Sequence, residues 1–252
     1  MNSSSRAAGS GQDRSAGEAN VRDTPVIPVE RLAMTFVPQP WRFAVERRAE
    51  IDAYFAELRR EKPALWNGRV LMLHRVSLAG GVLEGDFLET DYASLLAWRA
   101  WDFPDRTIKV CFPLSAIRSA DGAFLLGLMA AHTANGGQLY FPTGTPDPDD
   151  VRGEVVDFDG SLLRELAEET GLGPADVAAE PGWQAVDAGP RLALIKLLQS
   201  RQGADALRAR ILGHLASEQT PELADIVIVR GPADCDPRMP SFVTAFLHHW
   251  WS

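Results

Sequence analysis

The nine residues from Arg164 to Leu172, with the sequence RELAEETGL, constrain the fold more than any other segment of the chain. A helix turns by about 100° per residue, so Glu165, Glu168 and Glu169 fall within one arc of its surface. Three like charges held this close repel each other, and a bound hard cation such as Mg²⁺ or Mn²⁺ removes the repulsion. The segment therefore predicts a helix that presents carboxylates to a divalent metal.

The apolar residues on the other side of this helix indicate how it packs. Leu163 and Leu166 point away from the glutamates and can anchor the helix on a sheet, and Gly171 ends it. An ordinary solvated helix face is the commoner role of such a glutamate pattern. The context favours a site, because a turn with glycine and proline follows a strand and an acidic loop then leads into the helix. Arg164 is placed to orient a carboxylate by a charge-assisted hydrogen bond.

Composition limits the classes of protein to which the chain can belong. Its 252 residues carry a formal net charge of −9, which argues against a nucleic-acid partner, because binding through phosphates needs a basic face. No apolar run approaches the roughly 20 residues that span a bilayer, so we expect no membrane partner. Cys111 and Cys235 cannot build a disulfide framework, and the N-terminus has no apolar signal segment. We therefore expect a cytoplasmic protein.

Hydrophobic patterning predicts three regions along the chain. Residues 1–25 contain no aromatic residue, leucine or isoleucine and are expected to form a disordered tail. Residues 26–105 are expected to form an N-terminal extension of helix and hairpin, with a helix over 41–62, a hairpin over 70–88 and a short helix over 92–101. Residues 106–252 are expected to form the main domain.

The main domain is expected to mix strands and helices without strict alternation. The segments 108–117, 123–129, 138–141, 191–198 and 226–229 are predicted strands. The segments 160–170, 204–217 and 242–251 are predicted helices, and 143–160 is a predicted loop. This order favours an α/β fold of the α+β kind, a mixed sheet sandwiched between helices, over a doubly wound sheet.

The segment from Gly144 onward resembles the Nudix box, the loop–helix–loop signature of Nudix hydrolases. The second half of that signature reads R-E-U-x-E-E-x-G-U, where U is aliphatic, and every specified position is matched by Arg164, Glu165, Leu166, Glu168, Glu169, Gly171 and Leu172. The strand and turn before the box also resemble the family pattern, with Thr143 in place of the usual first glycine. The resemblance covers roughly residues 106–230 and implies the Nudix fold.

The first half of the box departs from the family pattern. Gly144 lies twenty residues before Arg164, six more than in the family, and Val156 stands where the box has a glutamate. A carboxylate from the same loop can stand in for it, or the helix carboxylates act alone. The acidic residues available in the loop are Asp147, Asp149, Asp150, Glu154 and Asp157, of which Glu154 and Asp157 flank the position of Val156.

The resemblance implies hydrolysis of a nucleoside diphosphate linked to another moiety, with Mg²⁺ or Mn²⁺ as cofactor. Glu168 and Glu169 would be the main metal ligands, and the carbonyl of Gly144 a further one. Glu165, paired with Arg164, would be a ligand or the base that activates water.

Further candidate residues lie outside the box helix. Family members often add a carboxylate from a downstream loop, for which Glu218 and Glu222 are candidates, with plain surface acids as the alternative. The region before the box can contact substrate, and its candidate residues are Tyr92, Arg99, His132 and Asn135. Trp98 and Trp101 could stack a base, although packing in the core is the commoner role of aromatics at this spacing.

A weaker likeness suggests the substrate. The stretch 66–99 resembles the N-terminal region of a divergent Nudix group that includes animal UDP-sugar pyrophosphatases, which makes a nucleotide sugar the first candidate. The alternatives are an ADP-ribose or dinucleotide pyrophosphatase and a catalytically weak Nudix-fold module that binds a nucleotide without cleaving it. The sequence leaves two roles for the N-terminal hairpin, a homodimer surface or a lid.

Overall fold

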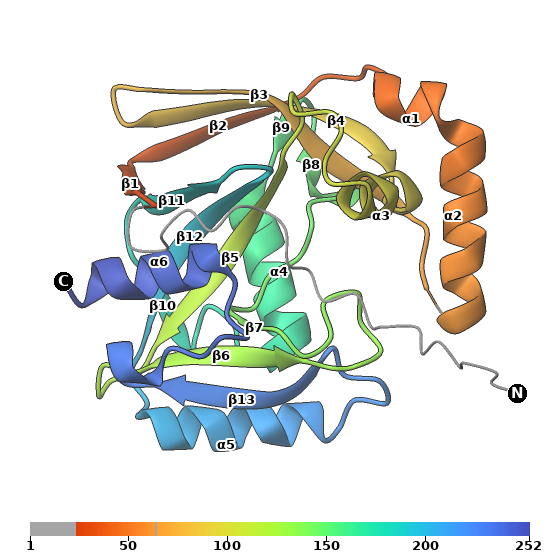
Figure 1. Ribbon diagram of the computed structural model, residues 1–252. Helices are drawn as coiled ribbons and strands as arrows, with labels where there is room; N and C mark the ends of the chain where they lie inside the picture. The colour runs from red at the N-terminus through yellow and green to blue at the C-terminus, as the bar shows by residue number, and fades with distance from the viewer. Residues whose placement is uncertain (1–23, 64) are drawn as a thin grey trace, which may run out of the picture.

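The computed structural model describes residues 24–63 and 65–252, which form two β-sheets with helices around them (Figure 1). The tail expected over residues 1–25 lies, up to residue 23, outside the described residues. The expected α+β fold with mixed sheets is confirmed. In the described part of the chain, every helix is too short or too polar to cross a bilayer.

The larger sheet has eight strands and supports the main domain. Its order is β1-β11-β12-β5-β6-β13, with β10 beside β12 and β7 beside β6. β12 and β5 run parallel and are buried along almost their whole length, as expected for strands covered on both faces. The strands are β1 (Val26–Val29), β5 (Val110–Arg118), β6 (Phe124–Met129), β7 (Leu139–Tyr140), β10 (Val177–Ala179), β11 (Trp183–Ala188), β12 (Arg191–Ser200) and β13 (Leu223–Val229).

Two helices lie on opposite sides of this sheet (Figure 1). α6 (Ser241–Trp250) packs phenylalanines on the sheet, with the Phe242 ring centroid 5.4 Å from that of Phe112 in β5. α4 (Phe158–Thr170), the glutamate-bearing helix, packs against β5 and against α5 (Ala204–Leu215). The two faces of the sheet therefore differ in role, because one carries an aromatic core and the other supports α4.

The smaller sheet has five strands in the order β3-β4-β2-β9-β8. The strands are β2 (Arg31–Phe36), β3 (Arg69–Ala79), β4 (Val82–Asp91), β8 (Val151–Arg152) and β9 (Val155–Val156). β3 and β4 form the expected hairpin, and β2 joins β4 in parallel. The other helices are α1 (Arg42–Glu46), α2 (Arg48–Glu61) and α3 (Tyr92–Ala100), with single 3₁₀ turns at Pro148–Asp150 and Pro232–Asp234.

Strand pairing crosses the expected domain boundary at residue 105 in both directions. β1 belongs by sequence to the extension but pairs with β11 in the larger sheet. β8 and β9 belong by sequence to the main domain but extend the smaller sheet, where Thr35 pairs with Val155. The division at residue 105 stays a prediction, and the two halves are interleaved.

Local predictions differ from the structure at three places. The expected helix over 41–62 is two helices, which meet at Arg47 because its backbone leaves the helical region (φ −107°, ψ 21°). The expected loop over 143–160 contains the β8–β9 hairpin and the start of α4. Strands β1, β2, β10 and β11 were not expected, because each is short or lies in a stretch without clear alternation.

Candidate active site

Helix α4 is fixed at both ends by short-range features of its sequence. The side chain of Asp157 caps the N-terminus by accepting a hydrogen bond from the Gly160 backbone N–H (2.9 Å). Gly171 ends the helix with a left-handed backbone (φ 68°), which favours glycine. Leu166 is fully buried and Leu163 is partly buried against the core, as expected, and Leu162 is a further, deeply buried anchor.

The glutamates of α4 line a pocket of about 180 Å³. Its other wall is the end of α5 and the loop that leads to β13. The backbone N–H of Ala130 donates to the carbonyl of Glu222 (2.8 Å) and thereby ties this loop to the end of β6. The pocket is lined by Glu165, Glu168, Glu169, Leu215, Glu218, Thr220, Pro221 and Glu222. The structure thus brings both downstream candidate carboxylates to the same pocket as the box glutamates.

Glu169 is the most buried of these carboxylates, with 6% of its surface exposed. Its Oε2 accepts a hydrogen bond from the Thr143 backbone N–H (3.1 Å), whereas its buried Oε1 has no hydrogen-bond partner. Burial, followed by the neighbouring charges of Glu165 and Glu222, raises the pKa of Glu169 well above its ordinary value. An unpaired buried carboxylate oxygen is costly to leave unsatisfied and is suited to bind a cation.

Glu165 lies directly against the backbone of Gly144. A Cβ added at Gly144 would fall 2.2 Å from the carboxyl carbon of Glu165, so this position accepts only glycine unless Glu165 moves. Burial raises the pKa of Glu165 to about 7, against the opposing effect of Arg164. The Glu165 carboxylate therefore lies beside the backbone of Gly144, whose carbonyl is an expected metal ligand.

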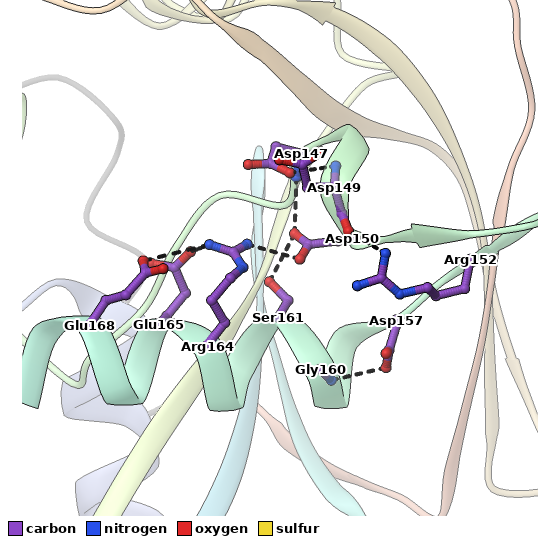
Figure 2. A network of polar contacts seen from close by, with 10 residues as sticks. All are labelled: Asp147, Asp149, Asp150, Arg152, Asp157, Gly160, Ser161, Arg164, Glu165 and Glu168. Atoms are coloured by element: carbon purple, nitrogen blue, oxygen red, sulfur yellow. Dashed lines mark hydrogen bonds and ion pairs between the residues drawn. The ribbon is translucent and has the colours of Figure 1, made fainter. Parts of the chain in front are cut away.

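Arg164 links this carboxylate to the loop before the helix (Figure 2). Its guanidinium donates to Glu165 Oε1 (2.6 Å) and to Asp150 Oδ1 (2.8 Å). Asp150 is 3% exposed, and its Oδ2 accepts hydrogen bonds from the Ser161 hydroxyl (3.0 Å) and the Asp147 backbone N–H (3.1 Å). Asp150 is thus the loop carboxylate that pairs with the box arginine.

Three further positions of the loop lie outside the contacts of Arg164. Val156 is buried in the core as part of β9. Glu154 is exposed in the turn between β8 and β9, and Asp157 is engaged in capping α4. A role of Glu154 or Asp157 as an extra carboxylate stays a prediction. In the structure the β8–β9 hairpin follows Asp150, and Asp150 is the loop carboxylate that contacts Arg164.

The candidate substrate residues divide into a connected set and an isolated one. The Arg99 guanidinium donates to Asn135 Oδ1 (3.1 Å), and Asn135 Nδ2 donates to the Tyr140 hydroxyl (3.0 Å). Tyr140, which sequence reasoning did not nominate, is three residues before Thr143 and its backbone bond to Glu169. His132 is exposed, and no contact of its side chain joins it to this set in the described part of the chain.

The tryptophans of α3 and its C-terminus have core roles. Trp98 is fully buried and donates from its ring nitrogen to the Asp105 carbonyl (2.9 Å). Trp101 is half-buried beneath the guanidinium of Arg47, 4.1 Å from its ring centroid. Packing, the commoner of the two roles considered for them, is the one that the structure shows.

Among the described residues, no three His, Cys, Asp or Glu side chains already meet in the arrangement of a formed metal centre. Glu165 is turned toward Arg164, and Glu168 is exposed at the pocket rim, 3.7 Å from the same guanidinium. Mutual repulsion of carboxylates accounts for this spread, because each turns to the nearest positive or N–H group.

We expect the metal-free protein to become less stable, relative to Glu165→Gln, as the pH rises from about 5 to about 8. The folded-state pKa of Glu165 is raised from 4.5 to about 7. Its stabilising contribution is therefore complete below the unfolded pKa and is lost as the pH rises through the folded value. The shift corresponds to about 3 kcal/mol.

Urea unfolding in EDTA at several pH values measures this difference. The subtraction cancels other titrating groups, such as His74, whose pKa is lowered chiefly by burial. A difference between wild type and Glu165→Gln that does not change with pH would contradict the prediction.

The chain matches no protein-family model and no curated protein. Part of the chain aligns with solved structures at low identity. The Nudix hydrolase RenU from M. smegmatis aligns with a TM-score of 0.37 and 15% identity over 56% of this chain and 81% of its own. The MutT protein from Methanosarcina mazei Go1 aligns with a TM-score of 0.37 and 18% identity over 56% and 92%.

A third solved structure is a bifunctional NMN adenylyltransferase/ADP ribose pyrophosphatase from Francisella tularensis. It aligns with a TM-score of 0.41 and 15% identity over 62% of this chain and 44% of its own.

Proposed function

We propose that this protein is a Nudix-type hydrolase that uses a divalent metal to cleave the pyrophosphate bond of a nucleoside diphosphate linked to another moiety. The observation that carries the proposal is the buried, unpaired Oε1 of Glu169 in a pocket lined by four further glutamates. A nucleotide sugar is the first candidate substrate. ADP-ribose and dinucleotides are the alternatives within the same chemistry.

The residues of the pocket fit Mg²⁺ or Mn²⁺. All the donors are oxygens, as these cations prefer, and the unpaired Oε1 of Glu169 is a ligand atom without a competing partner. Glu165, Glu168 and Glu169 with the carbonyl of Gly144 would hold the metal, and Glu222 or Glu218 would add a carboxylate from the opposite wall. When bound, the metal shields the charge of the two phosphates and lowers the pKa of the attacking water.

The protein's own groups supply orientation and proton transfer. Arg164 fixes the direction of the Glu165 carboxylate by its hydrogen bond and is itself held by Asp150. Glu165, held beside the Gly144 turn and hydrogen-bonded to Arg164, would act as a metal ligand or as the base that activates water. The Thr143 backbone N–H keeps Glu169 turned into the pocket.

A substrate panel tests the proposal. We expect hydrolysis of at least one of UDP-sugars, ADP-ribose, NADH and coenzyme A in Mg²⁺ or Mn²⁺, with a nucleotide and a second phosphate monoester as the two products of each cleavage. Excess EDTA should abolish the turnover, and readdition of metal should restore it. Equal turnover in EDTA would remove the metal mechanism.

The same panel separates the enzyme from a binding module that no longer cleaves. The binding module is an alternative because Val156 stands where the box has a glutamate. The pairing of Asp150 with Arg164 weakens this alternative, because the arginine still has a carboxylate partner from the loop. Tight binding of a nucleotide by calorimetry, with no product over hours in metal, would favour the binding module.

A further inference from the structure

An exposed tryptophan, Trp66, packs on Tyr92, the first residue of α3, the helix that also carries Arg99. Trp66 is 57% exposed, although its ring is held in place. The ring lies so close over Gly68 that a Cβ there would fall 1.5 Å from it, and its centroid is 5.8 Å from that of Tyr92. An aromatic face that is both fixed and open to solvent is a ready surface for a flat ligand ring.

The neighbouring helix α3 adds a positive charge without a carboxylate partner. Among the described residues, Arg99 forms no ion pair, and its one hydrogen bond goes to the neutral amide of Asn135. Arg99 is half-buried and follows Tyr92, which packs on Trp66, by seven positions, so both residues lie on one face of α3. A guanidinium in this setting is suited to pair with a phosphate.

The segment 130–138 joins these residues to the acidic pocket. Ala130 donates to the carbonyl of Glu222 in the pocket wall, while Asn135 accepts from Arg99 and Thr133 accepts from the Lys62 side chain (3.0 Å). Besides its burial, the pKa of Tyr92 reflects the charges of both Arg99 and Glu222, which places Tyr92 near both of them. Burial raises its pKa, the charge of Arg99 lowers it and the charge of Glu222 raises it further.

We propose that Trp66 and Arg99 form a nucleotide-recognition subsite, in which the base stacks on the open face of Trp66 and the phosphate next to the nucleoside pairs with Arg99. The subsite lies on the N-terminal extension and directs the diphosphate toward the glutamate pocket. Its place in a reaction rests on the proposed function. Its ability to bind a nucleotide does not, because neither residue belongs to the glutamate pocket.

Binding without metal tests the subsite separately from hydrolysis. The probes are the four common nucleoside 5′-monophosphates, their nucleosides and glucose 1-phosphate, titrated in EDTA by calorimetry or ligand-observed NMR. Trp66→Ala should raise the Kd of a nucleoside monophosphate about 5- to 150-fold, and Trp66→Phe should retain most of the affinity. Val76→Ala, an exposed apolar position on β3, is the matched control, and circular dichroism checks that each variant is folded.

Substitutions of Arg99 and of Trp66 should affect different ligands. Arg99→Ala should weaken the monophosphate about tenfold or more and leave the nucleoside within about twofold, whereas Trp66→Ala should weaken both. Unchanged affinity in Trp66→Ala, no measurable binding of any monophosphate, or a dependence on Trp66 seen only with glucose 1-phosphate would overturn the subsite. Binding that depends on Trp66 in a protein that hydrolyses nothing would support the subsite and contradict the proposed function.

Discussion

Replacement of Glu169 by glutamine should lower kcat/KM for the best substrate by at least about three orders of magnitude. The amide keeps the size of the side chain and its contact with the Thr143 N–H but removes the charge from the buried Oε1. Loss of a charged metal ligand costs several kcal/mol of transition-state stabilisation, and each 1.4 kcal/mol is about tenfold in rate. The measurement is initial rates across a range of Mg²⁺ concentrations.

Two controls make the result specific to the site. Glu180→Gln, at an exposed position outside the pocket, should leave the rate unchanged. In EDTA above pH 7, Glu169→Gln should be at least as stable as wild type, because it removes a buried carboxylate whose pKa is raised. Retained activity in Glu169→Gln would show that the pocket does not hold the catalytic metal.

Replacement of Asp150 by asparagine should cost about 2–4 kcal/mol of unfolding free energy and at least about tenfold in rate. Removal of one partner of a buried ion pair typically costs about 3–5 kcal/mol, and the lower range applies here because the Arg164 side chain is 35% exposed. Without Asp150, Arg164 is held only by the glutamates that it should orient. Urea unfolding and steady-state kinetics measure the two effects.

The neighbouring residue offers a matched control for this variant. Asp149→Asn makes the same change of charge at an exposed position and should have little effect on stability or rate. A double-mutant cycle of Asp150→Asn with Arg164→Gln should show strong coupling, because both changes break one contact. Additive effects of the two substitutions would contradict a role of Asp150 through Arg164.

The box helix could be predicted from the sequence because its signals are local. The spacing of the glutamates, the buried Leu166 and the stop at Gly171 depend on residues within four positions of each other. The hairpin over residues 69–91 and the cap of α3 by Asp91 could be predicted for the same reason.

The arginine partner and the aromatic subsite could not be predicted in this way. Counting at the family spacing leads to Val156, whereas the fold of the lengthened loop brings Asp150 to Arg164. Nothing local distinguishes Asp150 from its acidic neighbours before that fold is known. Trp66 is a candidate only because it packs on Tyr92 and Gly68, and Tyr140 only because Asn135 donates to its hydroxyl. Spacing along the sequence does not reveal these contacts. Strands β8 and β9 are too short to show periodicity and are stabilised by pairing with distant β2.

The β8–β9 hairpin connects the N-terminal extension to the glutamate-bearing helix. β9 pairs with β2 of the extension and continues directly into the capped start of α4. Deletion of residues 26–105 would leave the hairpin without its neighbour strand. Deletion of the hairpin would leave β2 as an unpaired sheet edge, which is prone to aggregation. The stability of the extension and that of the lengthened loop are therefore coupled, since each covers a strand edge of the other.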